Sequence, residues 1–299
     1  MTQKNREAAR RESGSEHSRR DFVALSAAAG LAAASGASRA AQASVMSMNV
    51  NIKTPDGVCD AALFHPASGT YPGVLLWPDA FGLRPATYAM GKRLAAEGYV
   101  VLVPNPFYRA SKAPQYDDVS KFNFQDPAQR SKMGPLMQPL QAPGAAERDA
   151  AAYIAYLDSQ SAVNKSKKIG TQGYCMGGPL IMKTAAALPD RVGAAASFHG
   201  GGLVTNMPDS PHLLAPKIKA QMYFGVAASD DKNEPDAKDK LRAALAAAGV
   251  KAEIEVYPNT LHGWCMSDMP KQGDQPIYNQ ADAERAWGKL LALYKVALA

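Results

Sequence analysis

The hexapeptide GYCMGG, residues 173 to 178, places a cysteine where it could act as a nucleophile. It follows a short apolar run and precedes a helical pattern, so Gly173-x-Cys175-x-Gly177 has the form of a nucleophile elbow. In such an elbow the chain turns so sharply from strand to helix that only glycine fits on either side of the nucleophile. The amino end of the following helix favours a thiolate over a thiol. We therefore expect Cys175 to be a reactive thiol that attacks carbonyl carbon.

A cysteine nucleophile needs a base, and two histidines compete for that role. His262 follows the last predicted strand, and His199 follows an earlier one. For the acid that orients the base, Asp230 and Asp231 follow the penultimate strand. The chain order Cys, Asp, His is the order of nucleophile, acid and base in α/β-hydrolases, which favours His262 over His199 as the base.

The chain holds three cysteines, Cys59, Cys175 and Cys265. An odd number at wide spacing cannot form a disulfide framework and matches no zinc pattern. We therefore expect no metal and no other cofactor, and at least one thiol that stays free.

Strand and helix patterns alternate after Asp60 and predict the scaffold that brings these residues together. Continuous apolar runs such as GVLLWP (73–78) and YVVLVP (99–104) are typical of parallel strands that are buried on both faces. We predict strands at 60–65, 73–78, 99–104, 167–173, 192–198, 218–227 and 251–258, and helices at 84–97, 145–160, 176–189, 235–249 and 280–298. The predicted fold class is α/β, a mostly parallel twisted sheet with helices on both faces. In such a sheet ligands bind beyond the carboxyl ends of the strands, where all the candidate residues lie.

The first 43 residues have the pattern of an export signal rather than of this fold. Arg19 and Arg20 precede an apolar, alanine-rich stretch, and Ala41-Gln42-Ala43 is a small-residue cleavage site. We expect a twin-arginine-type signal peptide over residues 1–43 and export to the periplasm. The rest, 44–299, is expected to form a single domain with a long loop or cap at 105–143.

The net charge of the chain is +6 at pH 7, and about half of this excess lies in the first 43 residues. A balance this mild, without a basic cluster that interleaves aromatic residues, argues against a nucleic-acid partner. No apolar run after the signal is long enough to span a membrane. We expect a small-molecule substrate, no nucleic acid and no membrane association after signal cleavage, and the sequence leaves the oligomeric state open.

The segments GYCMGG, LHGW and the FGL of WPDAFGL resemble the dienelactone hydrolase family, cysteine-dependent members of the α/β-hydrolase fold. The resemblance covers most of the chain after residue 50. Carried over by position, it implies Cys175 as the nucleophile, His262 as the base and Asp231 as the orienting acid. Asp231 is preferred to Asp230 because the family's acid stands four residues before a proline, here Pro235.

The resemblance also implies residues that bind the substrate. Ala80 and Met176 match the residues whose backbone N–H groups form the oxyanion hole, and Arg109 matches an arginine that holds a substrate carboxylate. Asp79, which is one methylene shorter, stands where the family has a glutamate that contacts the resting cysteine and gates it. Met266 stands where the dienelactone enzymes have a further arginine, which argues against dienelactone itself as the substrate.

These residues predict a hydrolase that cleaves a lactone or small carboxylic ester through a Cys-His-Asp triad and a thioester acyl-enzyme. A broad esterase or a thioesterase on the same fold is the first alternative, and a panel of substrates separates the two. An exported binding or thiol-redox protein without catalysis is the second, and the odd cysteine count favours it.

Overall fold

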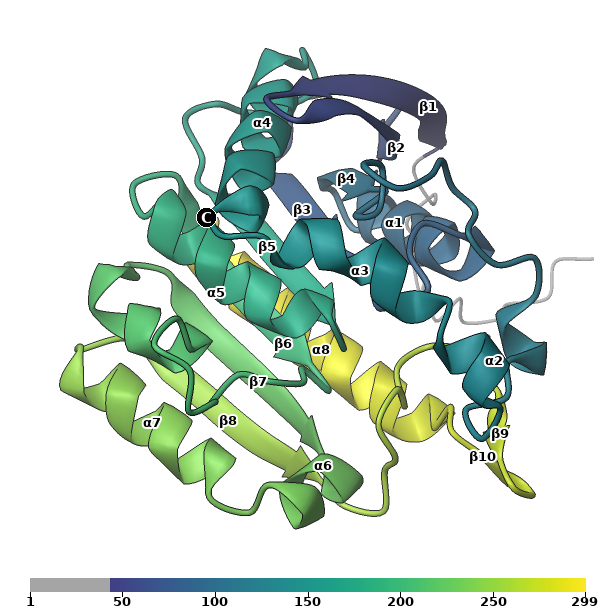
Figure 1. Cartoon of the computed structure of the whole chain (residues 1–299). Helices are drawn as coiled ribbons and strands as arrows, with labels where there is room; N and C mark the ends of the chain where they lie inside the picture. The colour runs from purple at the N-terminus through teal and green to yellow at the C-terminus, as the bar shows by residue number, and fades with distance from the viewer. Residues whose placement is uncertain (1–43) are drawn as a thin grey trace, which may run out of the picture. The chain divides into compact units, whose positions relative to one another are not determined.

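The computed structural model describes residues 44–299, and the predicted signal peptide lies outside the described residues. Eight strands form one sheet in the order β1-β2-β4-β3-β5-β6-β7-β8 (Figure 1). The hairpin of β1 and β2 joins β4 in antiparallel fashion, and the other strand pairs are parallel. The strands are β1 (Val45–Thr54), β2 (Gly57–Pro66), β3 (Gly73–Trp77), β4 (Val100–Pro104), β5 (Ile169–Tyr174), β6 (Val192–Phe198), β7 (Gln221–Ala227) and β8 (Ala252–Tyr257).

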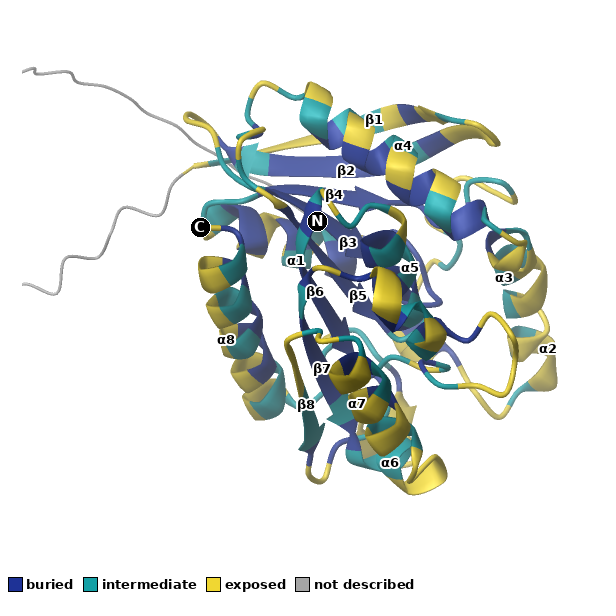
Figure 2. Cartoon of the chain, turned by 90° about the vertical axis from the view of Figure 1, so that its left-hand side faces the viewer, coloured by how far each residue is buried: buried dark blue, intermediate teal, exposed yellow. Residues whose placement is uncertain are grey.

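Helices cover both faces of the sheet (Figure 2). Leu75 and Trp77 of β3 point into one core cluster, whereas Val74 and Leu76 point into the other, as the alternation of side chains along a strand requires. Burial on both faces explains why these strands are continuous apolar runs. The first cluster includes α4 (Ala145–Ser159), α5 (Gly177–Ala187) and α7 (Ala237–Ala247), and the second includes α1 (Pro85–Ala96) and α8 (Gln280–Ala297).

The strands and helices predicted from the sequence are present within a few residues of their expected bounds. β1 was not predicted, because it is an edge strand whose residues are mostly exposed and form no apolar run. A short helix, α6 (Ala228–Asn233), was also not predicted, and it carries both candidate acids. Outside the segment 105–143, the other small elements are the 3₁₀ segment Pro211–Lys217 and the hairpin of β9 (Lys271–Gln272) and β10 (Gln275–Pro276).

The segment 105–143 is partly helical rather than a loop throughout. It contains the 3₁₀ turn Val119–Lys121 and the helices α2 (Pro127–Arg130) and α3 (Met133–Gln141). The ring of Phe122 packs edge-on against Phe81 at 5.0 Å, in a small cluster separate from the two main cores. The segment therefore contacts the residue directly after Ala80.

The strand order reverses beside β3, since the chain passes from β3 to β4 on one side and later continues from β5 to β6 on the other. The carboxyl ends of the strands at such a switch point flank a crevice where ligands bind in open α/β sheets. Ala80 follows β3 and Cys175 follows β5, so the fold brings these two residues to the same edge. Among residues 44–299, no helix is both long and apolar enough to cross a membrane.

Candidate active site

Cys175 lies on a strained turn between β5 and α5. Its φ of 52° is in the left-handed region, which non-glycine residues seldom adopt. Its backbone N–H donates to the carbonyl of Phe198 at 3.1 Å, which ties the turn to the end of β6. A side chain at Gly173 would overlap the carbonyl of Gly177, and a Cβ at Gly177 would lie 2.5 Å from the carbonyl of Trp77. The two glycines are therefore what lets the chain reverse here, as the pattern predicts.

His262 pairs with Asp230, and not with the predicted Asp231. The Nδ1 atom of His262 lies 3.0 and 2.9 Å from the two carboxylate oxygens of Asp230. The carboxylate of Asp231 instead pairs with Lys238 on α7 at 2.7 Å. Both aspartates are on α6, where consecutive side chains are rotated by about 100° around the axis. The choice of Asp231, made by counting back from Pro235, is therefore corrected to Asp230.

Two further polar residues hold the histidine loop against α6. The backbone N–H of His262 donates to the hydroxyl of Ser229 at 2.9 Å, and the N–H of Ser229 donates to the carbonyl of Thr260 at 3.2 Å. The hydroxyl of Thr260, 2% exposed, donates to the carbonyl of Tyr257. Sequence reasoning missed Ser229 and Thr260, because isolated small polar residues in a loop carry no distinctive pattern.

The environment of His262 favours the charged imidazolium. Burial opposes the charge, but the hydrogen bonds with Asp230 and the influence of Cys175 outweigh burial and raise the pKa of His262 to about 10. The partners of this histidine therefore include both the candidate nucleophile and an acid. An imidazolium between a carboxylate and a cysteine sulfur can stabilise a thiolate and later donate a proton.

His199, the competing base, is fully buried and has no hydrogen-bond partner on either ring nitrogen among the described residues. Burial and the neighbouring His262 hold its pKa well below the usual range. Its ring lies 5.2 Å from the ring of His262 and 5.1 Å from that of Trp264, edge-on to both. His199 is therefore a neutral packing group behind His262, with no carboxylate to orient it.

The backbone N–H groups of Ala80 and Met176 are free to bind a ligand. Neither donates a hydrogen bond within residues 44–299. Met176 immediately precedes α5, so its N–H belongs to the positive end of that helix. Met176 directly follows Cys175, and Ala80 follows β3, the strand paired with β5. Unpaired donors at this edge of the sheet could stabilise an oxyanion.

Asp79, the predicted gate of the thiol, has other partners. It is fully buried and accepts hydrogen bonds from both terminal nitrogens of Arg84, at 2.6 and 2.9 Å, and from the N–H of Phe81 at 3.0 Å. Burial raises the pKa of Asp79, and Arg84 opposes that rise. None of the hydrogen bonds of this carboxylate among the described residues reaches Cys175.

Arg109, the predicted clamp for a substrate carboxylate, is occupied by carboxylates of the protein. It donates two hydrogen bonds of 2.8 Å to Asp149 on α4, and two, of 2.6 and 3.2 Å, to Asp56 in the turn between β1 and β2. Met266, the position of the family's further arginine, is fully buried in the second core cluster. Arg109 therefore joins the hairpin to α4 instead of offering a free cation.

The other two thiols are in different surroundings. Cys59 is fully buried, and burial raises its pKa to about 12. Burial also holds the pKa of Cys265 well above the usual range. All three cysteines are free thiols, and no group of acidic, histidine or cysteine side chains within residues 44–299 has the arrangement of a metal site. Cys175 is thus the cysteine that combines a strained turn with a histidine partner.

Sequence relatives are found in several bacteria. The "putative carboxymethylenebutenolidase" of Escherichia coli (strain K12) is 26% identical over 77% of this chain and 78% of its own. A protein of the same name from Synechocystis sp. is 28% identical over 78% of this chain and 89% of its own.

Solved structures share the fold. A dienelactone hydrolase-like promiscuous phosphotriesterase from metagenomic libraries superposes with a TM-score of 0.67, at 19% identity, over 85% of this chain and 99% of that chain. The dienelactone hydrolase of Anabaena variabilis superposes with a TM-score of 0.57, at 15% identity and the same coverage. The model of the dienelactone hydrolase family matches residues 59–298. The chain belongs to the dienelactone hydrolase family, a family of hydrolases with the α/β-hydrolase fold.

Proposed function

We propose that this hydrolase cleaves a small neutral lactone or carboxylic ester through a triad of Cys175, His262 and Asp230. The observation that carries the proposal is the position of Cys175 on a strained elbow, together with a His262 ring that is paired with Asp230 and whose pKa Cys175 helps to raise. Nucleophile, base and orienting acid then stand in the relation that covalent catalysis requires.

In the first step the thiolate of Cys175 attacks the carbonyl carbon of the substrate and a carbon–sulfur bond forms. The N–H groups of Ala80 and Met176 bind the negative oxygen of the tetrahedral intermediate. When the intermediate collapses, the carbon–oxygen bond to the leaving group breaks, and the imidazolium of His262 gives that oxygen a proton. In a lactone this oxygen stays attached to the acyl group as a hydroxyl.

In the second step water hydrolyses the thioester. His262, now neutral, takes a proton from the water that attacks the thioester carbonyl. The carbon–sulfur bond breaks, the acid is released and the Cys175–His262 ion pair is restored. Asp230 keeps its position throughout, because its role is to orient the ring and to stabilise its charge.

The charges around the site favour a substrate without a carboxylate. Both terminal nitrogens of Arg109 donate to aspartates, and Met266 contributes an apolar side chain where the family has an arginine. A carboxylated dienelactone would therefore lack the two arginines that the family's pattern offers to replace the hydration of its carboxylate. A neutral ester or lactone does not lose this hydration, so a broad esterase activity is included in the proposal.

Hydrolysis of p-nitrophenyl acetate, short-chain esters and enol-lactones by the protein and its Cys175→Ala variant tests this function. We expect the variant to retain less than about one part in a thousand of the parent kcat/KM. Cys265→Ala is the matched control, since it also removes a half-buried thiol, and it should retain the parent activity. Equal rates for Cys175→Ala and the parent would contradict the proposal, and an inactive parent would favour a non-catalytic binding or thiol protein.

We also propose that residues 1–43 direct export to the periplasm by the twin-arginine route. The paired arginines, the apolar stretch and the site at Ala41-Gln42-Ala43 support this proposal. Sequencing the amino terminus of the protein from its native host tests it, with Ser44 expected as the first residue.

A further inference from the structure

Arg84 lies between two aspartates that are far apart in the sequence. It is the residue before α1 and is 2% exposed. Its terminal nitrogens donate to both carboxylate oxygens of Asp79, at 2.6 and 2.9 Å. Its Nε and one terminal nitrogen donate to the two carboxylate oxygens of Asp268, at 2.7 and 2.9 Å. One planar guanidinium thus holds two carboxylates by paired hydrogen bonds, which a lysine could not do.

The two aspartates belong to the two loops that carry groups of the proposed reaction. Asp79 directly precedes Ala80, whose N–H is a candidate oxyanion donor. Asp268 is in the loop that follows His262, the candidate base. Both loops are therefore joined to the start of α1 by the side chain of Arg84. We call Arg84 and its two partners, Asp79 and Asp268, the Arg84 bridge.

The Arg84 bridge is a strong local constraint. Burial opposes the charge on Arg84, but the two aspartates outweigh it and raise the pKa of the guanidinium. Asp79 is fully buried, whereas the side chain of Asp268 is 29% exposed. The guanidinium also donates to the carbonyl of Gly82 at 3.2 Å, which fixes the turn between Asp79 and α1.

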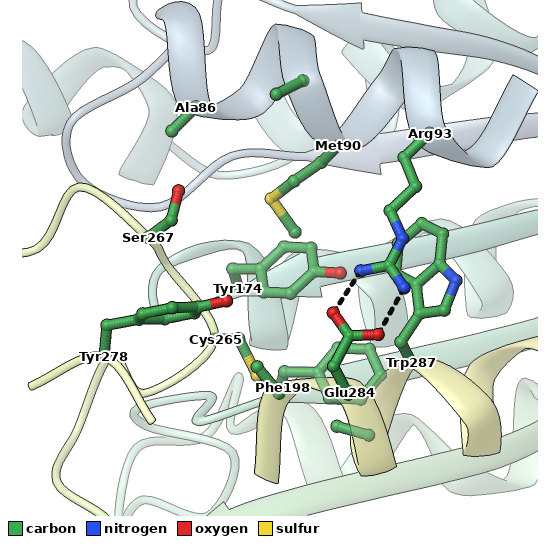
Figure 3. A pocket seen from close by; sticks show the side chains of 13 residues that line it. Ala86, Met90, Arg93, Tyr174, Phe198, Cys265, Ser267, Tyr278, Glu284 and Trp287 are labelled. Carbon is green, nitrogen blue, oxygen red and sulfur yellow. Dashed lines mark hydrogen bonds and ion pairs between the residues drawn. The ribbon is translucent and has the colours of Figure 1, made fainter. Parts of the chain in front are cut away.

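A cavity lies between α1 and the histidine loop next to the bridge. Its volume is about 160 Å³, and it also separates α1 from α8 (Figure 3). Ala86 and Met90 of α1 line one side of it, and Ser267 and Tyr278 line an adjoining side. Ala86 is two residues after Arg84, and Ser267 directly precedes Asp268. The Arg84 bridge therefore lies beside the cavity.

A second ion pair spans the same cavity farther along α1. Arg93 donates to Glu284 of α8 at 2.8 and 2.5 Å and lies over the ring of Trp287 (Figure 3). These side chains are 44% and 49% exposed, so water and salt screen the pair. The Arg93–Glu284 pair is therefore the weaker of the two links, and it does not touch the histidine loop.

We propose that Arg84 is a positioning residue that sets the distance between the oxyanion donor of Ala80 and the base His262. This proposal rests on the proposed function. Asp79 is then an anchor for the Ala80 loop rather than a gate that takes the proton of Cys175. His262, and not Asp79, is then the group that exchanges a proton with Cys175.

The test compares Asp268→Asn with Glu284→Gln, because each removes one carboxylate that links an arginine of α1 across the cavity. Asp268→Asn leaves the buried pair of Arg84 and Asp79 intact, so the variant should fold. We expect kcat for p-nitrophenyl acetate to fall roughly 10- to 100-fold in Asp268→Asn with KM changed less than about twofold, because displaced reacting groups slow the chemistry more than binding. Glu284→Gln should stay within about twofold of the parent, and Asp268→Glu should recover most of the lost kcat.

Three outcomes would overturn the positioning role of Arg84. A kcat for Asp268→Asn equal to that of Glu284→Gln overturns the positioning role, as does a loss that appears in KM alone. A loss that Asp268→Glu does not recover also overturns it. If instead Cys175→Ala is as active as the parent, the proposed function fails first and the positioning role fails with it.

Discussion

Which aspartate contacts His262 depends on the directions in which the adjacent side chains of Asp230 and Asp231 point from α6. On α6 the side chain of Asp230 faces the histidine loop and that of Asp231 faces Lys238. Counting residues along the chain cannot distinguish two neighbours on a short helix that has no apolar period. The sequence therefore predicts that an aspartate follows β7, and the geometry of α6 selects which one.

Asp230→Asn and Asp231→Asn form a matched pair of variants. We expect kcat/KM to fall by about 100-fold or more in Asp230→Asn, because an amide neither fixes the ring of His262 nor stabilises its charge. Asp231→Asn loses only a partly exposed pair with Lys238, so it should stay within about twofold of the parent. Ester hydrolysis assays check both, and equal losses would contradict the assignment of Asp230.

The raised pKa of His262 predicts that the stability of the fold depends on pH. The pKa of His262 is about 10 in the folded protein, above its value of about 6.5 in an unfolded chain. The charged histidine therefore stabilises the fold fully below pH 6.5, and this stabilisation is lost as the pH rises through 10. Since Asp230 is one cause of the raised pKa, the difference in unfolding free energy between parent and Asp230→Asn should shrink from pH 6.5 to pH 10. Denaturant titrations at both pH values measure it, and a constant difference would count against the pairing.

Side-chain partners are also why two predicted roles did not match the structure. Arg109 and Asp79 are where the family's pattern puts them, but each is paired with a charge that the pattern does not include. Asp149 and Asp56 hold Arg109, and Arg84 holds Asp79. Since these partners lie up to 53 residues away, they emerge only once the chain is folded.

At the scale of elements, the turn between β5 and α5 is the best-predicted part of the site. Glycine is required at positions 173 and 177, because a Cβ atom at either position would overlap a backbone carbonyl oxygen. The strands on either side of β5, β3 and β6, are buried on both faces, so their apolar runs are also clear signals. β1 and α6 were missed because one is exposed at an edge and the other is short and polar.

Gly173→Ala tests whether this turn excludes a side chain at position 173. The added methyl group would overlap the carbonyl of Gly177, so we expect a loss of at least about 2 kcal/mol in unfolding free energy. Gly288→Ala on α8 is the control, because a Cβ there meets no atom and alanine favours a helix by roughly 0.5–1 kcal/mol. Urea unfolding compares them, and a Gly173→Ala protein as stable as the parent would show that the turn tolerates a side chain.

At the scale of the whole molecule, the fold gathers at one edge of the sheet residues that are spread over most of the chain. Ala80, Cys175, Asp230 and His262 follow four different strands, all at their carboxyl ends. The segment 105–143 reaches this edge through Phe122, and α1 reaches it through the Arg84 bridge. Strand order and apolar pattern make the edge predictable, whereas the links between loops depend on side chains and are not.

The central claim is that Cys175 carries the acyl group during turnover. Acid quenching of the protein during hydrolysis of p-nitrophenyl acetate, followed by mass spectrometry of its peptides, tests this claim most directly. We predict an acetyl adduct on the peptide that contains Cys175, none on the peptides of Cys59 and Cys265, and none at this position in Cys175→Ala. Turnover with an adduct on another residue, or undiminished turnover by Cys175→Ala, would contradict the account.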